Sequence, residues 1–165
     1  MISFFVPGHP KTAGSKRAFM RPGMRFPVIV DDCKKGKVWR GDVKRFAIDA
    51  YKGPLIEGPL RVRMVFTMAR PKGHFRSGKH AHLLRDGARI EHASKPDVLK
   101  MARAVEDALT GIIWRDDAQI YDEHLTKLYG ETPGVMVAVE SLPINLAVPD
   151  PYERQAALAL AQVKA

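Results

Sequence analysis

The strictest pattern in the sequence is a period-two alternation in residues 60–68, LRVRMVFTM. Every second residue from Leu60 to Met68 is large and apolar, and arginine occupies two of the positions between them. Alternation of this kind predicts a β-strand with one buried face. The sheet that contains this strand therefore needs a second layer to cover that face.

A second pattern predicts a helix that can supply this layer. Residues 98–112 carry apolar side chains at helical spacing, with charged residues off the stripe. Pro96 and Asp97 suit the first turn of a helix, and Thr110-Gly111 suits its end. The apolar stripe contains Val98, Met101, Ala102, Val105, Ala108, Leu109 and Ile112.

The remaining segments complete an α+β pattern. Strands are predicted at 2–6, 26–32, 120–126 and 134–142, and a buried piece at Ile112–Trp114. A helix is predicted from residue 38, with Val38, Val43, Phe46, Ala47 and Ala50 near helical spacing, to its end at Gly53. The segment 11–26 has no regular period and is predicted to be a loop. Helices and strands in this order indicate a two-layer α+β domain, with a mixed or antiparallel sheet packed against helices.

The predicted domain covers residues 1–142, and the chain changes character after Leu142. Residues 143–165 form a C-terminal extension in which prolines 143, 149 and 151 precede an alanine-rich stretch with high helix propensity. Ala156, Leu160 and Val163 can form a small apolar stripe for docking. A frayed, partly helical or disordered tail is the alternative.

The charge balance favours a polyanionic partner. The 165 residues include 27 Lys and Arg against 18 Asp and Glu, a formal net charge of +9, which suits nucleic acid or an anionic membrane surface. No apolar run is long enough to span a bilayer, and the N-terminus lacks the pattern of a secretion signal, so a cytoplasmic protein without membrane association is expected. The single cysteine, Cys33, rules out an intrachain disulfide and a cysteine zinc cluster.

A long basic connection spans residues 69–95. Long connections in compact domains are typically functional or mobile, so this segment is interpreted as a phosphate-contacting loop, with a solvated loop as the alternative. His74, His80 and His82 lie within it. Their spacing, without a further ligand, gives weak support for a metal site.

Carboxylates flank the predicted helix 98–109 in an otherwise basic chain. Taken alone, Asp97 fits a helix cap, and Asp116-Asp117 fit a turn before a strand. A helix start and the start of a neighbouring strand can meet at one end of a sheet, which would bring Asp97 and Asp117 together. Clustered carboxylates need a proton or a cation, and Mg²⁺ or Mn²⁺ fits oxygen ligands. In a basic protein this combination indicates phosphodiester chemistry.

The stretch KPDVLKMARAVEDALTGIIWRDDAQI (95–120) resembles the signature of the RusA-type Holliday-junction resolvases. These are small endonucleases, often encoded by phages or prophages. The opening FFVPGHPKTAGSKRAF and the basic loop RPKGHFRSGKHAHLL resemble further parts of that family. The resemblance covers roughly residues 1–141. It implies a homodimer that binds four-way DNA junctions and cuts them with Mg²⁺ or Mn²⁺.

The resemblance also implies roles for individual residues. Asp97 and Asp117 correspond to metal-binding aspartates, and Asp116 to an acidic neighbour. In the implied mechanism the metal activates a water, while Arg103, with Lys100 nearby, neutralises charge on the phosphate. Arg103 replaces a family lysine and keeps its charge, although the two side chains are not equivalent.

Leu99 departs from the family pattern, because it stands where a second aspartate is expected. One interpretation is an active enzyme whose metal site is completed by Asp97, Asp116, Asp117, water and phosphate. The other is a noncatalytic branched-DNA-binding accessory protein with an impaired site. Glu106 lies on the same helix side but about 10 Å further along the axis, so it is an unlikely substitute at the same ion.

Backbone contacts to DNA are expected from two basic segments. They position DNA without reading its sequence, so affinity should fall steeply with salt. An RNA-binding module has less support, because no aromatic-rich recognition strand is evident. The expected DNA contacts are Lys16, Arg17, Arg70, Lys72, Arg76 and Lys79.

Overall fold

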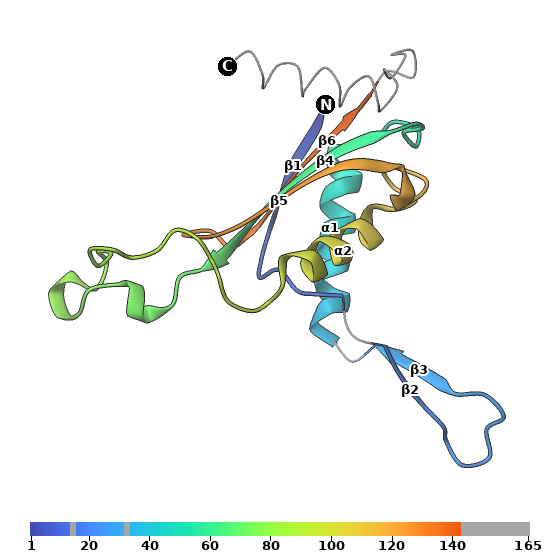
Figure 1. The fold of residues 1–165 in the computed structure, drawn as a ribbon, viewed down its shortest axis with the longest axis horizontal. Coiled ribbons are helices and arrows are strands. Elements are labelled where there is room, and N and C mark those ends of the chain that lie inside the picture. The colour runs from blue at the N-terminus through green and yellow to red at the C-terminus, as the bar shows by residue number, and fades with distance from the viewer. Residues whose placement is uncertain (14–15, 32–33, 143–165) are drawn as a thin grey trace, which may run out of the picture.

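A four-stranded mixed sheet forms the centre of the protein, as shown by a computed structural model (Figure 1). The structure describes residues 1–13, 16–31 and 34–142, so the C-terminal extension predicted at 143–165 lies outside the described residues. The strand order is β1-β6-β4-β5. Strands β1 and β4 both pair antiparallel with β6, and β4 pairs parallel with β5. The strands are β1 (Ile2–Pro7), β4 (Leu60–Ala69), β5 (Ile120–Gly130) and β6 (Gly134–Ser141).

Two helices, α1 (Lys34–Ala50) and α2 (Val98–Leu109), lie on one side of this sheet (Figure 1). The core lies between the two layers. Leu60, Val62, Met64 and Phe66 of β4 are fully buried there, as the alternation predicts. The expected α+β fold is therefore confirmed.

The helix α2 matches its predicted apolar stripe closely. Met101, Ala102, Val105, Ala108 and Leu109 are buried, and the C-cap is Thr110. Gly111 follows with a φ of 77°, a left-handed conformation that suits glycine at a helix end. After it, Ile113 and Trp114 are fully buried, as predicted.

Two local predictions are wrong. Residues 16–19 are not a loop but strand β2 (Lys16–Phe19), which pairs antiparallel with β3 (Val28–Asp31). The backbone of β3 supplies β2 with a partner that no side-chain period reveals. Helix α1 begins at Lys34 rather than at Val38, and it buries Trp39, Val43 and Ala47 at a spacing of four. Val38 lies one residue off this stripe and is 68% exposed.

The basic connection after β4 extends away from the sheet (Figure 1). It contains two short 3₁₀ turns, η1 (Lys72–His74) and η2 (Gly78–His80), and a third turn, η3 (Asp117–Gln119), precedes β5. None of the helices among the described residues is long and apolar enough to cross a membrane.

Candidate active site

Asp97 occupies the N-cap position of α2, but its side chain makes no capping hydrogen bond. Its carboxylate lies 3.3 Å from Lys100 Nζ, and both side chains are largely exposed. Pro96 precedes the cap. The prediction that it lies in the first turn is wrong, because the helix begins at Val98. Helix capping by the side chain therefore does not explain Asp97.

The segment before Asp97 is fixed by β5. Lys127 Nζ donates to the carbonyl oxygens of Ser94 and Pro96 at 2.6 and 2.7 Å. The backbone N–H of His92 donates to the Lys127 carbonyl at 3.2 Å. Strand β5 thereby holds the chain that leads into α2, and with it the position of Asp97.

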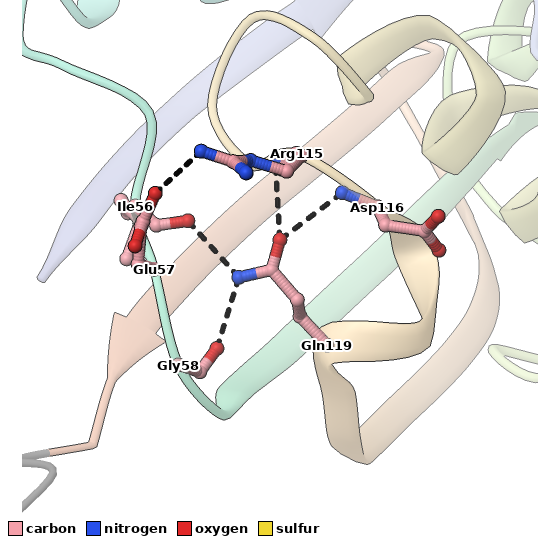
Figure 2. A network of polar contacts seen from close by, with 6 residues as sticks. All are labelled: Ile56, Glu57, Gly58, Arg115, Asp116 and Gln119. Carbon is pink, nitrogen blue, oxygen red and sulfur yellow. Dashed lines mark hydrogen bonds and ion pairs between the residues drawn. The ribbon is translucent and has the colours of Figure 1, made fainter.

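The turn η3 is held by Asp116 and Gln119 (Figure 2). Asp116 Oδ1 accepts from the Ala118 N–H at 2.9 Å, and Gln119 Oε1 accepts from the N–H groups of Arg115 and Asp116. Gln119 Nε2 donates to the carbonyls of Ile56 and Gly58, both at 3.0 Å. Asp116 and Gln119 therefore stabilise the turn and its contact with residues 56–58. The metal-binding role of Asp116 stays a prediction.

Three carboxylates meet where α2, η3 and β5 come together, in what we call the carboxylate pocket. Glu106, Asp117 and Glu123 line it. Burial raises the pKa of Glu106 to about 8, helped by a hydrogen bond with Glu123 and by the negative charges of Glu123, Asp117 and Asp107. Near neutral pH one proton therefore stays on this cluster.

Sequence reasoning placed Glu106 too far from Leu99 to replace the missing acid, and it did not consider Glu123. The position of Glu123 depends on the register of β5. Glu123 lies opposite the buried Val62, so its side chain is on the helix-facing side of the sheet. The structure therefore supplies an acidic neighbourhood for Asp117 that differs from the expected one.

Asp97 and Asp117 are not brought together within the chain. Asp97 lines a pocket at the start of α2, whereas Asp117 lines the carboxylate pocket beside Glu106. Nine residues, about 13 Å along the helix axis, separate Asp97 from Glu106. Over residues 1–13, 16–31 and 34–142, no group of three or more His, Cys, Asp or Glu residues is placed to hold a metal ion. The proposed ion shared by Asp97 and Asp117 has no support from this arrangement.

The face of α2 that carries Leu99, which departs from the family pattern, also carries the positive charge of Arg103. Leu99 is 68% exposed, and Arg103 and Glu106 follow it at spacings of four and three residues, which place all three on one side of the helix. Arg103 is exposed. The missing aspartate would therefore stand on the same face as Arg103 and the carboxylate pocket.

Arginines in the basic connection hold its backbone together. Arg70 donates to the Arg89 carbonyl at 2.9 Å, and Arg85 donates to the Phe75 carbonyl at 2.7 Å. Arg76 donates to the Leu84 carbonyl and pairs with Asp86. The side chains of Arg89 and of the lysines of this connection are exposed and make none of these contacts.

Lys72 and Lys79 are both exposed. Lys16 and Arg17 lie on β2. The DNA contacts predicted for all six residues, Arg70 and Arg76 included, stay predictions.

A family model described as "Endodeoxyribonuclease RusA" matches residues 7–140, from the last residue of β1 to near the end of β6. The chain belongs to the RusA family. One relative of the chain is a Bacillus subtilis (strain 168) protein named "Uncharacterized protein YqaN". It is 30% identical over 141 residues, which cover 86% of this chain and 96% of the relative. The RusA match contains both Asp97 and the three residues of the carboxylate pocket.

Proposed function

We propose that this RusA-family chain is a structure-selective endodeoxyribonuclease that resolves four-way junctions and other branched DNA by phosphodiester hydrolysis. The carboxylate pocket carries this proposal. It gathers Glu106, Asp117 and Glu123, and the exposed Arg103 lies on the same face of α2 as Glu106, in a chain with a net charge of +9. Acids beside a cation suit a reaction that activates water near a phosphate.

The donor set of this pocket fits a hard divalent cation. Mg²⁺ is commonly held by one or two carboxylates, with water and phosphate oxygens completing its shell, so a ready-made group of three ligands is not required. Asp117 and Glu123, with Glu106 beside them, would hold the ion. Mg²⁺ or Mn²⁺ bound there would lower the pKa of a water and stabilise charge on the phosphate.

In this proposal, side chains of the protein set the charge of the pocket and hold the DNA beside it. Glu106 holds a proton near neutral pH, so in the absence of a cation the pocket carries less negative charge than three ionised carboxylates. Arg103 can bind a phosphate bidentately. Lys72 and Lys79, with Lys16 and Arg17, would contact the DNA backbone, as would Arg70 and Arg76 where their bonds within the connection leave donors over.

Asp97 and Lys100 have separate proposed roles. Their ion pair at the start of α2 lies outside the carboxylate pocket, so Lys100 would contact the DNA strand there, while the metal-binding role of Asp97 stays a prediction. A homodimer, as the family resemblance implies, would present two such sites to symmetric strands of a junction.

A noncatalytic branched-DNA-binding protein is the second candidate. The exposed Leu99 at an expected aspartate position favours it. So does the lack of a ready-made metal site among the residues that the structure describes.

A nicking assay separates the two candidates. Wild type is incubated with a labelled synthetic four-way junction and with matched linear duplex, in Mg²⁺, in Mn²⁺ and in EDTA. The endonuclease proposal expects metal-dependent cuts in the junction alone, abolished by Asp117→Asn. The matched control is Asp49→Asn, an exposed carboxylate of α1 whose nearest cation, Lys52, lies 3.8 Å away. Junction binding without product in either metal would support the noncatalytic candidate.

A further inference from the structure

A second pocket, here called the basic pocket, lies at the start of α2. Its walls come from residues 9–12 after β1, from the end of β4 at Met68 and Ala69, and from residues 92–100. Its volume is about 600 Å³, within the range of roughly 300 to 1,000 Å³ that is typical of small-molecule sites. The pocket is therefore large enough for more than a water or a single ion.

The side chains that line this pocket carry more positive than negative charge. His9, Lys11, Lys95 and Lys100 line it, and Asp97 is its one acidic residue. Lys100 already pairs with Asp97. Lys11 and Lys95 remain to attract an anion.

The wall that carries Lys11 is anchored at both ends. The Gly8 N–H donates to the Pro133 carbonyl at 2.9 Å, and the Ala13 N–H donates to the Lys100 carbonyl at 3.0 Å. Gly8 has a φ of 131°, and a Cβ there would lie 3.3 Å from the ring of Trp39. Only glycine suits this turn, which brings the loop against the start of α2.

The wall that carries Lys95 is anchored by β5. Lys127 Nζ binds the carbonyls on either side of Lys95, those of Ser94 and Pro96. Both lysines therefore stand on segments that are fixed before a ligand arrives, which lowers the entropic cost of binding.

His92 forms part of the lining of the pocket. It is 9% exposed, and its ring lies 4.6 Å from that of Tyr129 on β5. This packing adds a further fixed wall to the pocket.

We propose that the basic pocket binds one nucleotide unit of a DNA strand, with a backbone phosphate between Lys11 and Lys95. The inference rests on the proposed action on branched DNA and names a contact site that the sequence did not indicate. Pro10, Met68 and Pro96 give the pocket an apolar lining for the sugar. The bound strand passes Asp97 at this end of α2 and is thereby held at a fixed distance from the carboxylate pocket.

The test is the salt dependence of junction binding, measured without metal so that cleavage does not interfere. Fluorescence anisotropy of a labelled four-way junction gives the affinity between about 50 and 200 mM NaCl. The slope of log affinity against log salt is negative, and its magnitude should decrease by about 1 in Lys11→Gln and in Lys95→Gln. In the double variant it should decrease by about 2. Lys11→Arg should restore the slope, since the charge is kept.

Lys52→Gln is the matched control, because Lys52 follows α1 and does not line the pocket. An unchanged slope in this control and a reduced slope in the double variant would support the site. A double variant with the wild-type slope would overturn the basic pocket while leaving the proposed function standing. Failure of the wild type to bind the junction would overturn both.

Discussion

Glu106 of α2 and Glu123 of β5 share a hydrogen bond between their carboxyl groups, beside Asp117. Two acids in this relationship keep a proton that isolated glutamates lose well below neutral pH. A divalent cation can take the place of that proton. In the proposed function, metal binding and protonation of this pair would therefore compete.

The retained proton predicts how stability depends on pH. The pKa of Glu106 is about 8 in the folded protein, above its ordinary value of 4.5, so the folded state binds more protons between these values. Stability from this group is complete below about pH 4.5, falls as pH rises, and is lost above about pH 8. Urea midpoints in EDTA from pH 5 to 9 should fall more steeply for wild type than for Glu106→Gln.

Asp86→Asn is the control for this comparison, because Asp86 is 97% exposed in the basic connection. Its profile should follow the wild type. Identical pH profiles for wild type and Glu106→Gln would show that the carboxyl group does not retain its proton.

Placing the aspartate of the family pattern at position 99 should increase junction cleavage. Leu99 is exposed, so Leu99→Asp should change the free energy of unfolding by less than about 0.5 kcal/mol. The added carboxylate lies on the face of α2 that carries Arg103 and Glu106, about 10 Å from Glu106 along the axis, where its negative charge can attract a divalent cation towards the pocket. Junction cleavage at limiting Mg²⁺ should therefore rise.

Leu99→Asn provides the matched control, since it is polar and similar in size to aspartate but carries no charge. Cleavage should rise in the aspartate variant alone. An equal change of junction cleavage in the two variants, or no change in either, would show that a negative charge at position 99 does not affect metal-dependent cleavage.

Gln119 is predicted to act on stability. Gln119→Glu keeps the oxygen that accepts from Arg115 and Asp116 but places an acceptor against the carbonyls of Ile56 and Gly58. Losing two partly buried hydrogen bonds should cost about 1 to 3 kcal/mol in the free energy of unfolding, measured by urea denaturation.

Arg115→Gln is the comparison for Gln119→Glu, because it removes only the exposed ion pair with Glu57. Exposed pairs contribute about 0 to 1 kcal/mol. A stable Gln119→Glu protein that no longer cuts junctions would contradict the structural role.

The two layers of the fold could be predicted because the sequence pattern of each main element indicates which of its faces is buried. Strand β4 does so by alternation, and α2 by its apolar stripe. Strand β3 was predicted within residues 26–32, but its hairpin partner β2 was not, since its four residues, KRAF, are too few to show a strand period. Of the predicted apolar positions of α1, Val43 and Ala47 are buried, whereas Val38 is exposed and Trp39 takes its place in the core.

The carboxylate pocket was hidden by the sheet register. An irregularity pairs Leu60 with Ile120 but Arg61 with Asp122. A shift of one residue exchanges the two faces of a strand. From that point Glu123, rather than Asp122, faces α2, and Asp122 instead pairs with Arg61 at 2.5 Å. No pattern in residues 120–126 reveals this change.

The site at which a divalent metal binds distinguishes the carboxylate pocket from Asp97. Anomalous diffraction from crystals of the wild-type protein grown with Mn²⁺ would locate the ion without reference to activity. We expect an ion in the carboxylate pocket, within about 2.2 Å of oxygen atoms of Asp117 and Glu123. An ion bound by Asp97 at the start of α2, with none beside Asp117, would contradict this expectation.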